Sequence, residues 1–273
     1  MGHEFAGVVD VVGRDVEAFA AGDRVCVFPF EPLDHHDLEV ALATGLGIGM
    51  VPGAYAEAIC VDQSMIWRLP EGVELQHGAL VEPLAVALHA LNVAEVEPEA
   101  ACAVIGAGPI GVMTALALRA RGAESVIVIE KNERRRRRIE ELGLDSVGLD
   151  GVHEAVPARL AAAPNVVFEC AGNPAAPALA IELVAPSGRV VLLGVLEEPV
   201  EISQLLLMLK EAEIRSSFAY RPADFDEAIE LIAAGRIPSE ALITAREPLE
   251  RAQEMFEELE RPETGHMKVL LQP

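Results

Sequence analysis

The chain has 273 residues, of which 51% are hydrophobic, and its formal net charge is −23. That length and composition allow one large or two ordinary domains with a sizeable core, while the strong negative charge argues against a nucleic-acid partner. No apolar stretch reaches the roughly 18 residues of a membrane span, and no basic stretch followed by an apolar core marks a signal peptide. The four cysteines are widely spaced without a C-x-x-C pair, so we expect a cytoplasmic protein without disulfides or a cysteine-rich zinc knuckle.

The first 70 residues are predicted to be rich in β-strands. Short β-branched runs at 7–12, 24–28 and 56–61 lie between Gly, Asp and Pro, which is typical of strands separated by turns. Residues 29–54 are predicted to form a long loop that contains Asp34-His35-His36-Asp37. We expect Cys26 and Cys60 to lie in the core of this region.

The middle of the chain alternates between predicted strands and helices. A helix over 77–94 leads into this region, and further helices are predicted over 134–142 and 175–184. Such alternation with short connections indicates a parallel, doubly wound sheet of the α/β class. Beyond it we predict helices over 224–234 and 248–259. The predicted strands of the chain from residue 100 onwards are 101–105, 125–129, 165–168, 189–193 and a closing strand over 268–271.

A glycine loop follows the first of these strands. It is Gly106-Ala107-Gly108-Pro109-Ile110-Gly111, and Glu130 ends the next strand 19 residues after Gly111 (130 − 111). In dinucleotide-binding units the three glycines serve the tight turn, the pyrophosphate and the helix packing, and the acid binds a ribose about 20 residues further on. The helix N-terminus then offers free N–H groups to the phosphates. The spacing predicts a dinucleotide site.

Glu130 also bears on which dinucleotide is bound. A carboxylate accepts hydrogen bonds from ribose hydroxyls and repels a 2′-phosphate, which favours NAD over NADP. Lys131 and the five arginines at 134–138 leave phosphate binding open. We expect those arginines to form a solvated helix face with Arg136–Glu140 and Arg137–Glu141 pairs, rather than a nucleic-acid patch, with Arg135 as a candidate cofactor contact.

Several motifs occur together in one order along the chain. Taken jointly, they resemble those of the zinc-dependent medium-chain dehydrogenases, and the string around Glu82 is similar to the sorbitol and 2,3-butanediol dehydrogenase branch. The motifs are Gly2-His3-Glu4, Gly22-Asp23-Arg24-Val25, Glu82-Pro83-Leu84-Ala85-Val86-Ala87-Leu88-His89, the glycine loop, Phe168-Glu169-Cys170-Ala171-Gly172, Gly188–Gly194, Lys210-Glu211 with Ser217-Phe218, and Lys268–Leu271.

The resemblance implies an architecture and a set of site residues. It implies a GroES-like β-barrel domain, here N-terminally truncated, over 1–76 and 236–273, and a Rossmann domain over 77–235. It implies a catalytic zinc held by His3 and Glu82, with Glu4 beside the metal. The implied cofactor contacts beyond the glycine loop, Glu130 and Arg135 are Cys170, Ala171, Gly194, Ser217 and Phe218.

The sequence also departs from the family pattern. The cysteine ligand and the relay hydroxyl that the family carries ahead of Gly-His-Glu are absent, as is the four-cysteine lobe of the structural zinc, so we expect one catalytic zinc site with its third ligand missing and no structural zinc. Taken alone, each residue is better explained structurally, His3 as a surface residue and Glu82 as a helix N-terminal residue favoured by the dipole, whereas together and in the family order they are ligands or former ligands. His35 and His36 in a Gly/Pro loop more often bind no metal.

Three functions follow as hypotheses. The first is NAD-dependent, zinc-assisted oxidation of a secondary alcohol or polyol to a ketone. The second is a non-catalytic dinucleotide-binding protein or an inactive fragment, and the third a zinc-free quinone or enone reductase that uses NADPH. The resemblance further implies a homo-oligomer, dimer or tetramer, whose partner is a small-molecule alcohol rather than a nucleic acid or a membrane.

Overall fold

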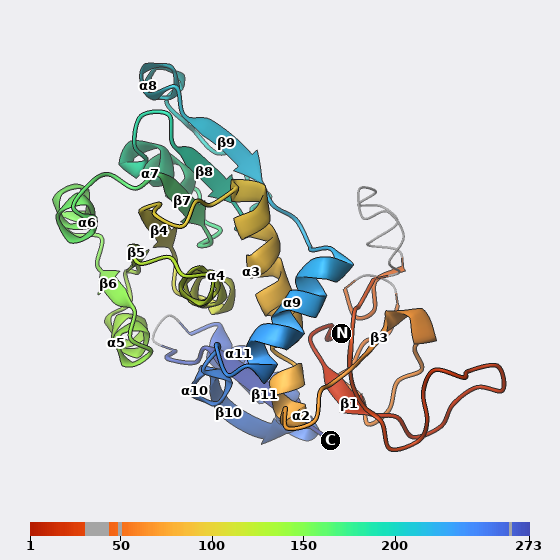
Figure 1. Ribbon diagram of the computed structural model, residues 1–273. Helices are drawn as coiled ribbons and strands as arrows, with labels where there is room; N and C mark the ends of the chain where they lie inside the picture. The colour runs from red at the N-terminus through yellow and green to blue at the C-terminus, as the bar shows by residue number, and fades with distance from the viewer. Residues whose placement is uncertain (31–43, 49–50, 262–263) are drawn as a thin grey trace. The chain divides into compact units, whose positions relative to one another are not determined.

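The computed structural model describes residues 1–30, 44–48, 51–261 and 264–273, so Asp34–Asp37, with His35 and His36, lie outside the described residues. The chain divides into two compact units (Figure 1). Unit 1 comprises Met1–Ala85 and Ala219–Pro273, and unit 2 comprises Val86–Phe218. Assignment of 77–235 and of 1–76 with 236–273 to two functional domains stays a prediction.

Unit 2 is built on a six-stranded parallel sheet with the strand order β6-β5-β4-β7-β8-β9. The strands β4 and β5 are continuous apolar runs buried on both faces, and β7 and β8 are apolar except for Glu169 and Arg189, as expected where helices cover both sides of a parallel sheet. The order reverses between β4 and β7, the arrangement of a doubly wound dinucleotide-binding fold, which confirms the predicted class. The strands are β4 Cys102–Ile105, β5 Val126–Ile129, β6 Asp145–Val147, β7 Val166–Glu169, β8 Arg189–Leu192 and β9 Glu213–Ser216.

The helices of unit 2 connect these strands in sequence. In α4 (Pro109–Ala120), Gly108 is the N-cap, Pro109 occupies the first turn, and most of the residues are buried. Proline suits that position because its missing N–H would be unpaired there in any case. The other helices are α3 Val81–Ala94, α5 Glu133–Glu141, α6 Val152–Leu160, α7 Ala176–Leu183 and α8 Gln204–Lys210.

The arginine run lies in α5, where Arg134 and Arg137 are exposed and the other three arginines are half-buried, and its ion pairs differ from the expected ones. Arg137 pairs with Glu133, and Arg138 pairs with Glu141. Arg136 instead donates from Nη1 to the carbonyl oxygens of Glu130 and Lys131. Because the chain turns back at Asn132, those carbonyls lie closer to the Arg136 side chain than a carboxylate one turn ahead.

Unit 1 contains two small sheets. The strands β1 (Ala6–Val8), β2 (Arg24–Val27) and β3 (Ile66–Arg68) pair antiparallel, and β10 (Ile243–Pro248) pairs parallel with β11 (Lys268–Gln272). A cluster of aromatic rings packs behind the first sheet, namely Phe28, Phe30, Trp67, Tyr220 and Phe225. The remaining elements are η1 Gln63–Met65, α2 Leu75–Gly78, α9 Pro222–Ala233, α10 Ser239–Leu242, η2 Leu249–Arg251 and α11 Ala252–Leu259.

Two strand predictions in unit 1 were wrong in extent or in kind. Of the run 7–12 only Gly7 and Val8 pair, as part of β1, and 56–61 forms no strand within the described part of the chain. Just before 56–61, Ala54 and Tyr55 donate their N–H groups to the carbonyls of Gly2 and Met1 rather than to a strand partner. Cys26 is buried as expected, whereas Cys60 is exposed.

None of the helices among the described residues combines the length and the apolar character needed to cross a bilayer.

Candidate active site

The predicted dinucleotide residues lie at one edge of the sheet of unit 2. Because all six strands run parallel, their carboxyl ends meet at the same edge, and the glycine loop follows β4 next to the point where the strand order reverses. Ligands of open α/β sheets bind in the crevice at such a point. Glu130 ends β5, Cys170 and Ala171 follow β7, Gly194 follows β8, and Ser217 and Phe218 follow β9.

The geometry of the glycine loop gives a different reason for glycine at each of its three positions. Gly106 has φ +100°, and a Cβ there would lie 3.0 Å from the backbone of Ala171. A Cβ at Gly111 would lie 1.9 Å from the carbonyl oxygen of Gly106, so only glycine fits. A Cβ at Gly108 would meet no atom within 4 Å among the described residues. Gly108 therefore leaves open space at the N-terminus of α4, where a phosphate is stabilised by free N–H groups.

Glu130 is tied to the loop by its side chain. Its Oε2 accepts a hydrogen bond from the N–H of Ala107 at 2.8 Å, and its Oε1 accepts one from the N–H of Asn132 at 2.7 Å. The residue is 6% exposed. Each carboxylate oxygen has further lone pairs, so the same group can still accept from ribose hydroxyls. The sequence predicted the acid but not its contact with Ala107.

The other predicted cofactor residues differ in their surroundings. Arg135 is half-buried in α5 with its Nε unpartnered, and the buried Ser217 hydroxyl is likewise unpartnered among the described residues. Burial raises the pKa of the Cys170 thiol to about 12, so this cysteine is not a nucleophile at neutral pH. Phe218 is 54% exposed.

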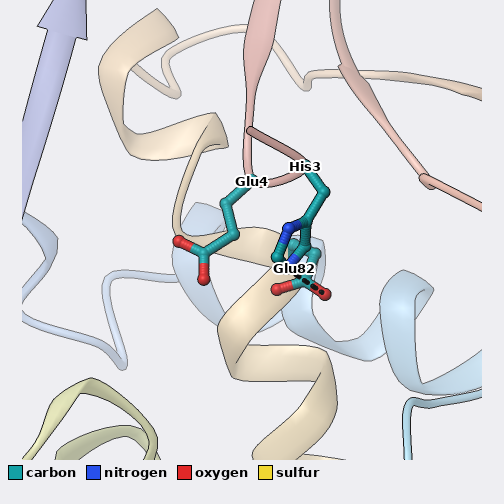
Figure 2. Close-up of side chains that lie close together, drawn as sticks. All are labelled: His3, Glu4 and Glu82. Atoms are coloured by element: carbon teal, nitrogen blue, oxygen red, sulfur yellow. Dashed lines mark ion pairs between the residues drawn. The ribbon is translucent and has the colours of Figure 1, made fainter. Parts of the chain in front are cut away.

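The predicted metal ligands come together in unit 1. One ligand atom each from His3, Glu4 and Glu82 lies within 4.8 Å of the others. Figure 2 shows the His3 ring beside the Glu82 carboxylate, with Nε2 and Oε1 3.9 Å apart, and the Glu4 carboxylate to one side. Glu82 is held in the first turn of α3, and His3 and Glu4 immediately precede β1.

Burial dominates the electrostatics of this cluster. It raises the pKa of Glu82 to about 8, an effect only partly offset by the hydroxyl of Tyr220, which faces the carboxylate. Burial, and secondarily the charge of Lys268, lower the pKa of His3, which keeps the imidazole neutral at pH 7. A neutral imidazole and a buried carboxylate without a full cationic partner form a donor set suited to a metal cation.

Lys268 was not among the predicted site residues. It comes from β11 and forms an ion pair with Glu4, and burial lowers the pKa of its ammonium to about 8. The pairing engages Glu4, so His3 and Glu82 are the two donors of the cluster that face each other. A signal was present in the sequence, because Lys268 is one of three lysines and interrupts an apolar run, which indicates a buried charge that needs a partner.

His3, Glu4 and Lys268 also line a cavity within unit 1 of about 1540 Å³. Its walls are largely apolar and include Val8, Val11 and Leu270. The donor set fits zinc in its chemistry, since histidine and carboxylate ligands are common in zinc sites, although catalytic zinc takes three protein ligands. The cavity leaves room beside His3 for a further ligand.

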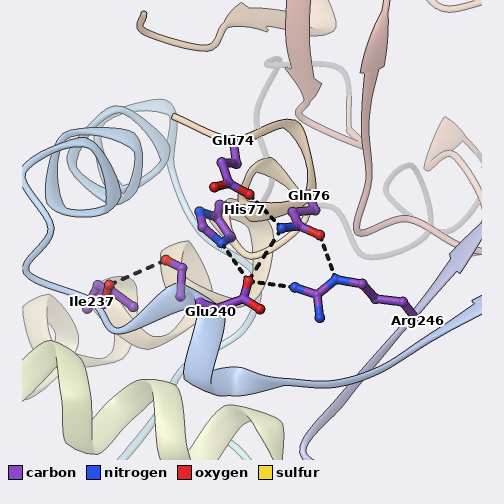
Figure 3. A network of polar contacts seen from close by, with 7 residues as sticks. Glu74, Gln76, His77, Ile237, Glu240 and Arg246 are labelled. Atoms are coloured by element: carbon purple, nitrogen blue, oxygen red, sulfur yellow. Dashed lines mark hydrogen bonds and ion pairs between the residues drawn. The ribbon is translucent and has the colours of Figure 1, made fainter. Parts of the chain in front are cut away.

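A second group of metal-ligand residues lies elsewhere in unit 1. Glu74, His77 and Glu240 bring one ligand atom each within 4.8 Å. Figure 3 shows that Glu240 is already surrounded by donors, with Arg246 Nη2 at 2.6 Å and His77 Nε2 at 3.4 Å. Gln76 completes the network by accepting from Arg246 Nε. The arginine neutralises the carboxylate, so this group is best described as a polar network.

Comparison with known proteins decides the family. The profile described as "Zinc-binding dehydrogenase" matches residues 109–234, and the profile described as "Alcohol dehydrogenase GroES-like domain" matches residues 1–71. The (R,R)-butanediol dehydrogenase of Bacillus subtilis (strain 168) is 32% identical over 280 residues, covering 100% of this chain and 80% of that protein. The chain belongs to the zinc-type medium-chain dehydrogenases. Members of this family are oxidoreductases, and the part of this dehydrogenase ahead of residue 72 is GroES-like.

Solved structures give the same assignment. The crystal structure of 2R,3R-butanediol dehydrogenase from Bacillus subtilis superposes with a TM-score of 0.90 at 31% identity, over 100% of this chain and 80% of that one. A putative zinc-binding dehydrogenase from Sinorhizobium meliloti 1021, bound to NADP, has a TM-score of 0.88 at 30% identity over 99% and 82%. A short chain alcohol dehydrogenase from E. coli CFT073, complexed with NADH, superposes with a TM-score of 0.88 at 27% identity. The match covers 99% of this chain and 83% of that one. The dehydrogenase is therefore related to proteins that bind either nicotinamide cofactor.

Proposed function

We propose that this dehydrogenase oxidises a secondary alcohol or polyol to a ketone, with NAD as the hydride acceptor and with zinc assisting the reaction. The observation that carries the proposal is the pair formed by the half-buried His3 and the buried Glu82. A nicotinamide site alone would serve many reactions, whereas a neutral imidazole 3.9 Å from a buried carboxylate is explained by a cation between them. The reaction converts the alcohol and NAD⁺ to the ketone, NADH and a proton.

The chain's own residues supply binding and electrostatics. His3 and Glu82 would hold the zinc, which supplies Lewis-acid polarisation of the substrate oxygen when bound. Tyr220, 1% exposed, limits water at Glu82 and presents its hydroxyl to that carboxylate. Lys268 holds Glu4 and, through its charge, helps keep His3 unprotonated.

NAD rather than NADP is the proposed cofactor. Glu130 is buried with its carboxylate directed at the glycine loop, and a 2′-phosphate beside it would meet a negative charge. The proposed dinucleotide contacts lie along one sheet edge, from the glycine loop to Phe218. One of the arginines that could bind a phosphate, Arg136, is engaged by the backbone carbonyls of Glu130 and Lys131.

A second candidate function is a non-catalytic dinucleotide-binding protein. It is favoured by the ion pair between Glu4 and Lys268, which leaves two donors where catalytic zinc takes three. In that case the protein would bind NADH without retaining stoichiometric zinc and without turnover. Metal analysis of the purified protein separates the two candidates, since one tightly held zinc per chain contradicts the second.

The test of the first candidate is NADH formation from 2,3-butanediol, sorbitol and threonine, with and without added zinc. We expect turnover of at least one alcohol, loss of activity with a chelator and recovery with zinc. The Glu82→Gln variant is the matched control, because it keeps the size of the side chain and weakens the ligand. No turnover of any alcohol at high enzyme concentration contradicts the proposal.

We further propose that the protein is a cytoplasmic homo-oligomer that assembles through the sheet of unit 2. Among the described residues no strand pairs with the outer side of the edge strand β9, and α8 exposes Leu205, Met208 and Leu209 at 66%, 67% and 73%. Exposed apolar side chains beside an unpaired strand favour association with a second copy. Light scattering should show a dimer or tetramer, and Leu209→Glu should shift it towards the monomer, whereas a monomeric wild-type protein contradicts the proposal.

A further inference from the structure

A second buried carboxylate lies at the cofactor edge of unit 2, one strand away from the glycine loop. Glu169 is the last residue of β7, the strand that pairs with β4 on the side opposite β5 (Figure 1). It is 2% exposed. No role follows for it from the dinucleotide pattern, and burial of an ionised group is costly unless the group is hydrogen-bonded.

The side chain of Glu169 is bonded to the backbone that follows it. Its Oε1 accepts hydrogen bonds from the N–H groups of Ala171 at 2.8 Å and Gly172 at 2.9 Å. Gly172 has φ +58°, so the chain turns sharply there. Charge-assisted bonds of this kind are stronger than neutral ones, and the carboxylate therefore fixes the turn over residues 170–172.

Glu169 also anchors the loop that follows the next strand. Its carbonyl oxygen accepts from the N–H groups of Leu193 and Gly194, both at 2.9 Å. Gly194 lies so close that a Cβ there would be 2.5 Å from Glu169 Oε2 and 2.4 Å from the nitrogen of Gly172. Side chain and main chain of one residue thus hold the turns after β7 and β8 together.

The turn after β7 in turn supports the glycine loop. Gly106 approaches Ala171 so closely that a Cβ on it would lie 3.0 Å from the Ala171 nitrogen and Cα, and a Cβ on Gly111 would lie 3.4 Å from the Cys170 side chain. Interiors packed this tightly transmit displacements. A shift of Ala171 would therefore move Gly106, which leads the chain out of β4.

We propose that Glu169 is a positioning residue for the dinucleotide. It acts through the turn over 170–172, which sets the position of the glycine loop, and it makes no contact with the cofactor itself. Glu130 holds the loop from the β5 side and Glu169 supports it from the β7 side. The effect on NADH affinity rests on the proposed function, whereas the coupling of Glu169 to the glycine loop does not.

The test combines two measurements on the full chain. NADH affinity is measured by fluorescence titration, and the exchange of backbone amides over 104–112 is measured by hydrogen–deuterium exchange without cofactor. Glu169→Ala should weaken NADH binding by about tenfold or more, because the N–H groups of Ala171 and Gly172 lose their acceptor and the turn over 170–172 is no longer fixed. It should also speed exchange at the glycine loop. Glu169→Gln keeps an acceptor oxygen and should stay within about threefold of the wild type.

Two further variants keep the test decisive. Ala171→Gly removes the side-chain contact with Gly106 while leaving Glu169 in place, and should speed loop exchange even if Glu169→Ala does not fold. Glu124→Ala, an exposed position ahead of β5, is the control and should change neither measurement. Unchanged loop exchange in Glu169→Ala, or in Ala171→Gly if the former is unfolded, overturns the inference. Wild-type protein that binds no NADH instead overturns the proposed function.

Discussion

The two units differ in how completely they form their sites. In unit 2 the glycine loop and the turns after β5 and β7 lie at one edge of the sheet, and buried carboxylates accept hydrogen bonds from the N–H groups of these loops. In unit 1 the metal-ligand cluster has two facing donors, a third carboxylate paired with Lys268, and a cavity of about 1540 Å³ beside it. The proposed dinucleotide site is thus preorganised, whereas the proposed metal site is only partly assembled.

The difference shows what each site requires. The dinucleotide edge is built mostly from backbone positions within one continuous segment, so local spacing specifies it. The metal cluster needs side chains from positions 3, 82 and 268, which only long-range packing brings together. The buried Glu82 is therefore the most sensitive group of unit 1, because its carboxyl is buried without a full cationic partner in the described structure, which raises its pKa to about 8.

The largest expected effect is on the glycine loop. Gly111→Ala places a methyl group 1.9 Å from the Gly106 carbonyl oxygen, which the backbone cannot accommodate without moving the helix. We expect loss of NADH binding together with a strongly lowered melting temperature, measured by calorimetry. Gly108→Ala is the matched control: its Cβ meets open space, so the fold should persist while affinity falls. Normal NADH affinity in Gly111→Ala contradicts this account of the loop.

The next largest effect concerns zinc. Glu82→Gln replaces a carboxylate ligand by a neutral amide and should lower zinc affinity by about 100-fold, while NADH affinity in unit 2 changes little. Competition with a chromophoric chelator measures the first and fluorescence titration the second. Glu74→Gln, in the polar network with Glu240, serves as control. Equal zinc affinities of the wild type and Glu82→Gln exclude Glu82 as a ligand.

A pH dependence of stability sharpens the contrast further. The folded-state pKa of Glu82 is raised to about 8, so without metal the folded protein holds a proton that the unfolded chain has lost by pH 6.5. Stability should then fall as pH rises from 6.5 to 7.5, by up to about 1.4 kcal/mol per pH unit. The lowered pKa of His3 affects the pH dependence of stability below pH 6.5, and the lowered pKa of Lys268 affects it above pH 7.5.

Urea unfolding of chelator-treated protein at several pH values measures this slope. Glu82→Gln has no proton to lose and should show a flatter profile. A wild-type stability that rises across the same window would show that Glu82 is ionised in the folded state.

The smallest expected effect is on cofactor choice. Glu130→Ser removes the charge that opposes a 2′-phosphate and also releases the Ala107 N–H. We expect the preference for NADH over NADPH to fall by about fivefold, with some loss of affinity for both. Parallel titrations with the two reduced cofactors measure the ratio. An unchanged ratio would assign the preference to residues other than Glu130.

The sequence predicts one unit better than the other for physical reasons. Buried parallel strands are uninterrupted apolar runs, so the strands predicted over 101–105 and 125–129 lie within a residue or two of β4 and β5. The spacing of the glycines could also be recognised, because the turn after β4 requires glycine at fixed positions. The run 56–61 has residues that favour a strand, but a strand also needs a partner, which local composition does not provide. The pair of Glu4 and Lys268, and Tyr220 facing Glu82, join segments far apart in the chain, so no local pattern contains them.

The central claim is that the cofactor half of this dehydrogenase is complete without its metal. Fluorescence titration of the chelator-treated full chain with NADH tests it most directly. We predict saturable binding of one NADH per chain, at least about tenfold tighter than NADPH and unchanged when zinc is added back. Absence of saturable binding without zinc, or tighter binding of NADPH, would contradict it.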